Sequence, residues 1–193
     1  MKNLFFVLFA LSTFILYGQE DFDTYGKNSI LLRNLRINLQ ANVLQNFSIS
    51  KSSGKKNFNI GNTVSAGLEF VWLYAQKMDY GIGIFYQTNT LIDTSIGKIG
   101  FIPIYAFIDF PLIQNDIFPV QFTSQLGYSF ISIKNGAKKV NDGIYHALGI
   151  TFVISKYTQL KFLYSHNYGK INLISEDYSF RKENLTIALY YKF

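Results

Sequence analysis

Cysteine is absent from this 193-residue chain, proline occurs only three times, and charged residues make up only 16% of it. Without cysteine there is no disulfide framework, no thiolate metal site and no cysteine nucleophile. The scarcity of proline excludes collagen-like and proline-rich chains. Average soluble proteins carry about 25% charged residues, so this deficit argues against intrinsic disorder and against an ordinary water-facing surface.

The N-terminus has the features of an export signal. Lys2 is followed by an apolar run from Leu4 to Tyr17, and the small residue Gly18 comes next. This order is typical of a secretory signal peptide, and the run is shorter than the ~20 residues of a membrane-spanning helix. We predict a cleaved signal peptide at 1–18, a periplasmic segment at 19–34 and one domain at 35–193.

Beyond residue 34 no stretch is long and apolar enough for a helical membrane span. Apolar and polar residues instead alternate with the two-residue period of a β-strand. Nearly every alternating segment has the ~9–11 residues that a tilted membrane strand needs. The eight segments are Leu35–Ile49, Thr63–Tyr74, Tyr80–Leu91, Ile99–Phe110, Val120–Phe130, Gly143–Ile154, Thr158–Gly169 and Asn184–Phe193.

Alternation alone fits either a membrane barrel or a soluble ligand-binding barrel, because both have one polar and one apolar face. Here the polar face carries mostly Gly, Ser, Thr, Asn and Gln, which suit a narrow lumen better than a surface in water. The apolar face is aliphatic with aromatic residues toward its ends, as on a lipid-facing surface. Strict alternation puts Phe47 on this face, and Ile102, Ile104, Ala106 and Ile108 on one side of their segment.

The fold class that follows is all-β: an eight-stranded antiparallel up-and-down transmembrane β-barrel preceded by a cleaved signal peptide. Its location would be the outer membrane, with both termini in the periplasm. The longer connections between segments would be extracellular loops, as in other barrels of this class. They cover residues 50–62, 92–98, 134–142 and 170–183.

Five charged residues fall on the inward face of the predicted strands. A charge that faces lipid near the membrane midplane costs roughly 2–4 kcal/mol, which favours inward placement. Because a lumen of eight strands is only wide enough for side chains to fill it, we interpret these charges as a paired structural plug. The alternative is a proton or ion path along Glu69 and Lys161. The five residues are Arg36, Glu69, Asp109, Lys161 and Lys192.

The predicted outer loops carry much of the formal net charge of +6. A basic balance can indicate nucleic-acid binding, but clustered arginine is lacking and export makes that partner improbable. We expect these cations to contact the phosphorylated head groups of outer-membrane lipids. The basic rim residues are Lys51, Lys55, Lys56, Lys138, Lys139, Arg181 and Lys182.

Candidate catalytic chemistry is sparse. Ser165 and His166 are adjacent, so on a strand their side chains point to opposite faces and cannot share a hydrogen bond. His146 falls in an apolar row, which places it at the lipid interface. No metal-ligand spacing, phosphate-binding glycine loop or paired carboxylates are present. We therefore predict no catalytic residues, no cofactor and no metal site.

The C-terminal strand resembles the terminal assembly signal of outer-membrane barrels. Leu185, Ile187, Leu189, Tyr191 and Phe193 share one face and Phe193 ends the chain. Together with the Gly-rich strands and the Ile102-Pro103 strand start, this resembles the small "outer membrane protein beta-barrel domain" (porin-like) family. The resemblance implies an eight-stranded barrel recognised by the barrel-assembly machinery, and most members have no assigned activity.

Deletion of Phe193 is expected to slow assembly of the barrel. An exposed terminal strand can be taken up by strand addition before the barrel closes, and the deletion shortens that strand. The folded yield in the outer membrane measures the effect, and a normal yield would refute the prediction.

The sequence thus favours a monomeric, non-enzymatic barrel with a structural or surface-binding role through its outer loops. Three alternatives remain open: a narrow porin-like channel, an accessory barrel of a protein-secretion system, and a soluble lipocalin-like carrier.

Overall fold

The computed structural model describes residues 34–51, 54–74, 78–93, 96–113, 119–134, 139–173 and 176–192. The predicted signal peptide, residues 19–33, Lys138 and Phe193 lie outside these ranges. No helix within the described ranges is long and apolar enough to cross a membrane. The strands are β1 (Leu35–Lys51), β2 (Gly54–Ile60), β3 (Thr63–Tyr74), β4 (Met78–Asp93), β5 (Gly97–Ile113), β6 (Val120–Lys134), β7 (Lys139–Asn141), β8 (Gly143–Val153), β9 (Thr158–Leu173) and β10 (Glu176–Lys192).

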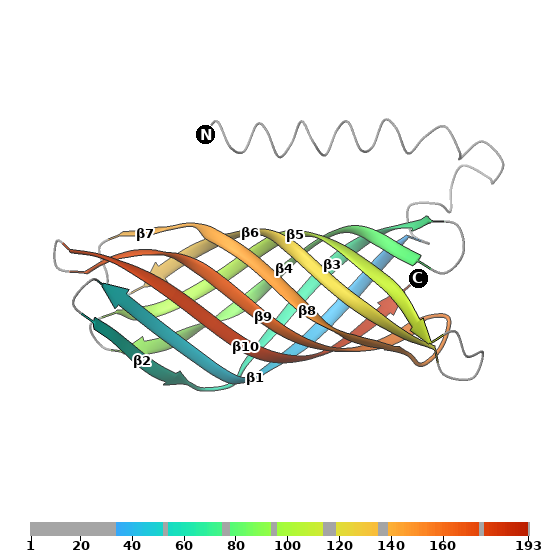
Figure 1. The fold of residues 1–193 in the computed structure, drawn as a ribbon, viewed down its shortest axis with the longest axis horizontal. Coiled ribbons are helices and arrows are strands. Elements are labelled where there is room, and N and C mark those ends of the chain that lie inside the picture. Colours follow the sequence, from blue (N-terminus) through green and yellow to red (C-terminus); the bar gives the residue numbers. More distant parts are fainter. Residues whose placement is uncertain are drawn as a thin grey trace, which may run out of the picture. The chain divides into compact units, whose positions relative to one another are not determined.

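Eight of these strands form a closed antiparallel ring in the order β1, β3, β4, β5, β6, β8, β9 and β10, and β10 pairs back onto β1 (Figure 1). The two short strands β2 and β7 lie next to β3 and β8 in the chain and pair with β1 and β9 respectively. The predicted eight-stranded barrel is confirmed. We call the end at which β1 begins and β10 finishes the terminal end, and the opposite end the distal end.

The two faces of the barrel differ as predicted. Leu39 is 61% exposed on the outside, whereas its neighbour Asn38 is fully buried inside. Ile102, Ile104, Ala106 and Ile108 of β5 also face outward. Each ring strand contains a stretch in which no outward-facing residue is Asp, Glu, Lys or Arg. We call the outward-facing residues of these eight stretches together the apolar belt. It comprises the outward residues of 35–43, 64–72, 80–86, 102–110, 122–130, 144–152, 160–164 and 185–191.

The apolar belt has the height of a membrane's hydrocarbon region. Nine residues of strand at ~3.3 Å each, tilted by about 40° from the barrel axis, rise about 23 Å. Lipid-facing bands of outer-membrane barrels are about 25 Å tall. Five of the eight stretches have this length, and those on β4, β9 and β10 are shorter. The belt therefore matches the height of a single membrane crossing over most of the circumference.

One residue departs from strict alternation. Leu44 has a positive φ of 47° and the β1–β10 register shifts between Val43 and Asn46, which marks a β-bulge. An extra residue in a strand reverses the faces of everything after it. Phe47 consequently faces inward and is completely buried, so its predicted outward placement was wrong.

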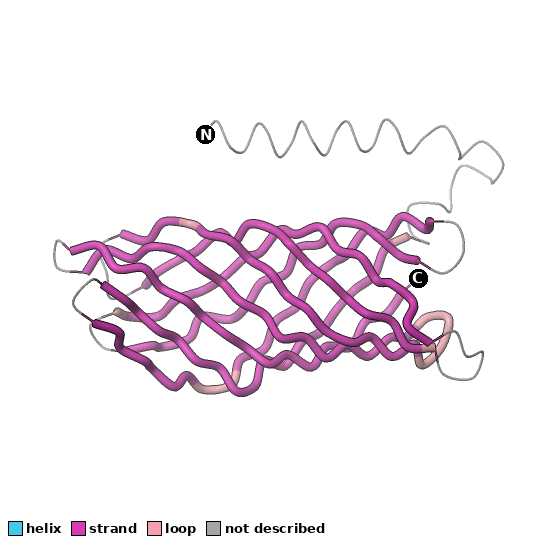
Figure 2. Tube along the Cα trace, in the orientation of Figure 1, coloured by secondary structure: helices cyan, strands magenta, loops and turns pink. Residues whose placement is uncertain are grey.

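The predicted outer loops were also too long. β2 occupies much of residues 50–62, and β9 and β10 extend through most of 170–183. Figure 2 shows strand running along nearly the whole barrel. Beyond the apolar belt the outward positions carry polar residues, so alternation fades although the backbone hydrogen-bond ladder continues. Lys55 and Lys56 therefore lie on β2, and Arg181 and Lys182 on β10.

Candidate functional site: the filled lumen

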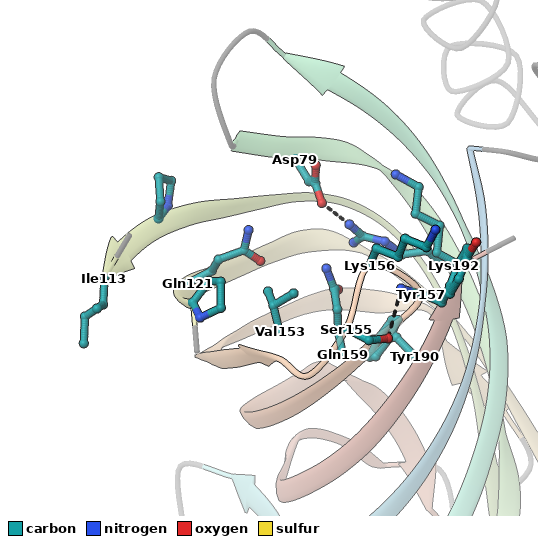
Figure 3. Close-up of a pocket in the computed structure, with 13 residues that line it drawn as sticks. Asp79, Ile113, Gln121, Val153, Ser155, Lys156, Tyr157, Gln159, Tyr190 and Lys192 are labelled. Atoms are coloured by element: carbon teal, nitrogen blue, oxygen red, sulfur yellow. Dashed lines mark hydrogen bonds and ion pairs between the residues drawn. The ribbon is translucent and has the colours of Figure 1, made fainter. Parts of the chain in front are cut away.

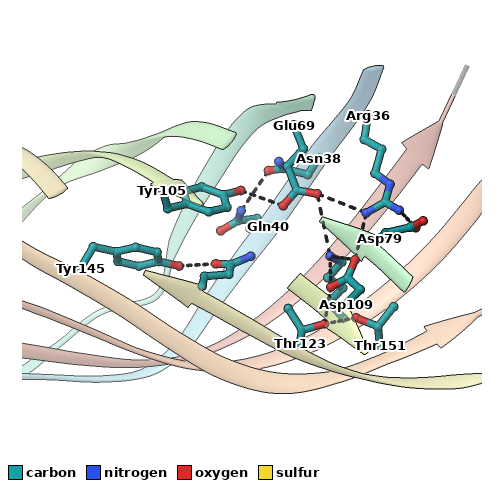
Figure 4. Close-up of polar contacts among 12 residues, drawn as sticks. Arg36, Asn38, Gln40, Glu69, Asp79, Tyr105, Asp109, Thr123, Tyr145 and Thr151 are labelled. Carbon is teal, nitrogen blue, oxygen red and sulfur yellow. Dashed lines mark hydrogen bonds and ion pairs between the residues drawn. The ribbon is translucent and has the colours of Figure 1, made fainter. Parts of the chain in front are cut away.

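The terminal half of the lumen holds a buried network of charges. Asp109 of β5 is at its centre, since its carboxylate lies 3.0 Å from Arg36 Nη1 of β1 and 2.9 Å from Lys161 Nζ of β9 (Figure 4). Glu69 of β3 lies 3.5 Å from Arg36 and 3.8 Å from Lys161. All four side chains are at most 1% exposed. Four of the five predicted lumen charges therefore meet.

The fifth member of the network is Asp79 rather than Lys192. Asp79 of β4 forms an ion pair with Arg36. We missed it because we began that strand at Tyr80, although continuing the alternation back by one residue gives Asp79 an inward position. Lys192 is paired in register with Arg36 at the strand end and lines the mouth of the lumen. The network and Lys192 together thus comprise three acidic and three basic groups.

Neutral donors complete the network. The hydroxyl of Tyr105 donates to Glu69 Oε1 at 2.9 Å, and that of Thr123 donates to Asp109 Oδ1 at 2.8 Å. Lys161 Nζ also lies 4.4 Å from the ring centroid of Tyr190. Buried ions are tolerated only when they are paired and their remaining hydrogen-bonding positions are filled. The arrangement meets both conditions for Glu69 and Asp109.

Hydrogen-bonded amides and hydroxyls form a second tier toward the distal end. Asn42 Nδ2 donates to Ser65 Oγ at 2.7 Å and Gln87 Nε2 donates to Thr63 Oγ1 at 2.8 Å. Thr186 Oγ1 of β10 donates to Asn42 Oδ1 of β1 at 2.8 Å, which links the last ring strand to the first. These are the small polar residues whose alternation predicted a lumen face.

A cluster of apolar side chains occupies the distal part of the lumen. Phe47 and Phe180 stack with ring centroids 5.3 Å apart, and Phe101 packs edge-on against Phe180 at 6.2 Å. We call this cluster the distal plug. It comprises Phe47, Ile49, Ile60, Ile96, Ile99, Phe101, Ile171 and Phe180. Sequence reasoning did not find it, because these residues lie beyond the bulge or outside the predicted segments, or were assigned to an ambiguous strand.

The mouth at the terminal end contains a cavity of about 350 Å³ (Figure 3). Arg36 and Asp79 line it together with Lys156 and Lys192, and Gln121 and Gln159 contribute amides. The cavity and the charge network therefore share Arg36 and Asp79. Apolar side chains, including Ile113 and Val153, also line it. The cavity is a vestibule of mixed polar and apolar lining on the terminal side of the network.

Lys182 was predicted at the outer rim but lies inside the barrel. Only 1% of it is exposed. Its ammonium nitrogen lies 4.6 Å from the ring centroid of Phe101 and has no hydrogen-bond partner among the described residues. Burial alone holds the pKa of this amine well below the ordinary lysine value. Its inward position follows from the alternation of β10, a strand that begins at Glu176 and not, as predicted, at Asn184.

Replacing Lys182 with methionine is expected to stabilise the fold. The folded chain binds fewer protons than the unfolded chain between the two pKa values, so wild-type stability rises with pH through that window. Removing the buried amine should raise the free energy of unfolding by about 1–3 kcal/mol near pH 7. The gain should shrink toward pH 10.5, the ordinary lysine pKa, because the unfolded lysine then also loses its charge.

Urea titrations of both proteins at pH 7 and pH 10 measure this gain. Lys55→Met is the matched control because Lys55 is exposed on β2, and its effect should be near zero. An equal gain at both pH values would contradict the prediction.

Other rim cations lie on the distal end and pair with acids there. Lys51 Nζ is 2.7 Å from Glu176, and Lys56 Nζ is 3.7 Å from Asp93. Arg181 pairs with Glu183 at 2.5 Å. Lys55 is exposed and Lys139 begins β7. The distal rim is thus a mixed charge surface and not a purely basic one.

Ser165 and His166 lie on opposite faces, as predicted. Ser165 is buried inside and accepts a hydrogen bond from Asn184 Nδ2 at 3.1 Å. His166 faces outward, where it stacks on His146 with ring centroids 4.6 Å apart and its Nδ1 accepts from Arg181 Nε at 3.2 Å. The pair is not arranged as nucleophile and base. Leu185, Ile187, Leu189 and Tyr191 share the outward face of β10.

Comparison with known proteins identifies the fold. No family model matches the chain, and no curated protein does so either. Among solved structures, Neisserial surface protein A aligns over 83% of this chain and 97% of its own, with 16% identity and a TM-score of 0.52. OprG from Pseudomonas aeruginosa aligns over 83% and 97% with 14% identity and a TM-score of 0.48. Ail of Yersinia pestis covers 82% and 97% with 11% identity and a TM-score of 0.47. The fold is that of a small antiparallel β-barrel like Neisserial surface protein A.

Proposed function

We propose that this protein is an outer-membrane barrel whose distal end serves a structural or surface-binding role and which catalyses no reaction. The observation that carries the proposal is the apolar belt. Outward residues such as Val64, at 62% exposure, and Leu126, at 65%, would be costly to leave in water around a whole circumference. Next to the belt, Arg36, Glu69, Asp109 and Lys161 are paired with one another inside the lumen. This is the arrangement that a hydrocarbon environment requires.

The proposal places both termini in the periplasm and the distal end outside the cell. Tight connections such as residues 154–157 then lie on the periplasmic side, as is usual for outer-membrane barrels. Cations on the distal end, including Lys55 and Lys56, would contact phosphorylated lipid head groups there. The protein would act as a monomer and take no nucleic-acid partner.

Trp72 provides a direct test of membrane insertion. It is the chain's single tryptophan and lies in the apolar belt on β3. After expression of the full chain, we expect it in the outer-membrane fraction with a folded form that migrates differently after heating. Acyl chains labelled with bromine should quench Trp72 in the folded protein. Extraction without detergent, with no quenching, would instead support a soluble carrier.

The filled lumen predicts an absence of steady conductance. The charge network and the distal plug occupy the interior of the barrel, and side chains suffice to fill an eight-stranded lumen. Planar-bilayer recordings on the purified protein should show no stable single-channel steps. Reproducible steps would favour the channel alternative, and co-purification with large envelope complexes would favour an accessory role in secretion.

A further inference from the structure

The barrel wall is incompletely hydrogen-bonded at its distal end. β3 and β4 pair from Tyr74–Met78 as far as Ser65–Gln87. Beyond that point β4 pairs with β5, while β2 pairs with β1 alone among the described strands. The edges of β2 and of residues 88–93 therefore face one another without a ladder between them. We call this gap the β2 notch.

Side chains alone bridge the β2 notch. Lys56 Nζ lies 3.7 Å from Asp93 Oδ2, although 66% of the lysine side chain is exposed. An exposed pair at that distance contributes less than about 1 kcal/mol. β2 itself is exposed at Gly54, Lys55, Lys56 and Asn57. Its free edge is therefore accessible from water.

A second gap in the backbone ladder lies between β6 and β7. Unlike the β2 notch, it has a side chain bonded to a backbone group of the strand edge. β6 pairs with β8 only as far as Ser129–Gly143, and β7 pairs with β9. There the backbone N–H of Ile131 donates to Asp142 Oδ1 at 2.8 Å. A carboxylate thus occupies a backbone donor that an incoming strand would use. Edge strands are commonly protected in this way, and no such side-chain contact covers β2 among the described residues.

We propose that the free edge of β2 binds an extended acidic peptide of a partner protein by strand addition. The inference rests on the proposed surface-binding role and specifies its partner. An unpaired strand edge supplies the backbone donors and acceptors that a new strand needs. Two lysines, Lys55 and Lys56, lie on this strand, which itself carries no acid. Lys56 is already paired with Asp93 across the notch, so Lys55 is the cation of β2 that favours an acidic strand over a basic one.

The faces of β2 define the partner further. Phe58 packs against the distal plug and Ile60 belongs to it. Lys56 shares their face of β2, so one face of an added strand would meet these two apolar side chains beside Lys56. Lys55, Asn57 and Asn59 are exposed, so its other face would meet polar and basic groups. Alternate side chains of a strand point to opposite faces. The partner segment should alternate apolar with acidic residues.

The test measures binding of a labelled hexapeptide of alternating valine and glutamate to the full-length barrel in lipid nanodiscs. We expect saturable binding that is at least tenfold tighter than that of the valine–lysine peptide. Lys55→Glu should weaken binding of the acidic peptide about fivefold. Lys170→Glu is the matched control, because Lys170 is exposed on β9 but this strand is paired on both sides at that position. The Lys170→Glu barrel should bind the acidic peptide with the same affinity as the wild-type barrel.

Two N-methylated versions of the acidic peptide separate strand addition from simple charge attraction. Each blocks the amides that point to one side of the strand. We expect one version to bind at least tenfold more weakly and the other to bind unchanged. Equal binding of all three peptides, or no binding to a barrel that is folded and inserted, would overturn the inference. A chain that fails to insert would instead overturn the proposed function.

Discussion

Replacing Asp109 with asparagine is expected to lower the free energy of unfolding by about 3–5 kcal/mol, the usual cost of removing one partner from a buried ion pair. Among the described residues, Asp109 is the one carboxylate that lies within 3.0 Å of both Arg36 and Lys161. Asparagine preserves its shape but not its charge. The two buried cations would then have only Glu69, at 3.5 and 3.8 Å, and Asp79 for compensation.

Urea unfolding of the refolded barrel in vesicles, followed by the fluorescence of Trp72, measures this loss. Glu176→Gln is the matched control, because it removes an acid from the exposed ion pair with Lys51, 2.7 Å away. Exposed pairs contribute about 0–1 kcal/mol. If Asp109→Asn cost no more than this control, the lumen network would not contribute to the stability of the barrel.

Replacing Gly83 with valine is expected to cost about 3 kcal/mol or more, through overpacking and the loss of a hydrogen bond to a charged group. Gly83 lies opposite both Glu69 and Tyr105 in the register of β3, β4 and β5. A Cβ at this position would come within 2.5 Å of the Tyr105 ring. The ring lies over the glycine and its hydroxyl reaches Glu69 at 2.9 Å. Valine would displace the ring and break that contact.

The same unfolding assay tests this substitution. Gly61→Val is the control, because a Cβ there would meet no atom within 4 Å, and it should change stability by no more than about 0.5 kcal/mol. Combining Gly83→Val with Tyr105→Ser should recover part of the loss, because the serine vacates the space that valine needs. If the double variant were less stable than Gly83→Val alone, the steric explanation would be wrong.

The sequence predicted which side chains point into the barrel and which point outward, because the direction of a side chain on a strand depends only on its place in the alternation of neighbouring residues. Within the apolar belt each strand has an apolar outer face on one side and the polar lumen on the other, so the types of neighbouring residues such as Asn38 and Leu39 reveal which way each side chain points. Four lumen charges could be identified in this way. The fifth, Asp79, required only a correct strand boundary. Boundaries were less certain because polar residues continue the strands beyond the belt, where water contacts the outer face.

The amino-acid sequence by itself determined that the chain forms eight amphipathic strands with a polar interior, since alternation needs only neighbouring residues to be read. Tertiary structure alone decided which interior groups meet. The stagger between strands brings Arg36 to Asp109 and Lys161 to Glu69, which no local pattern encodes. The bulge at Leu44 turned the Phe47 side chain inward, where it joins the distal plug. Contacts across a barrel depend on the register of every pair around it, and a shift of one residue reverses a face.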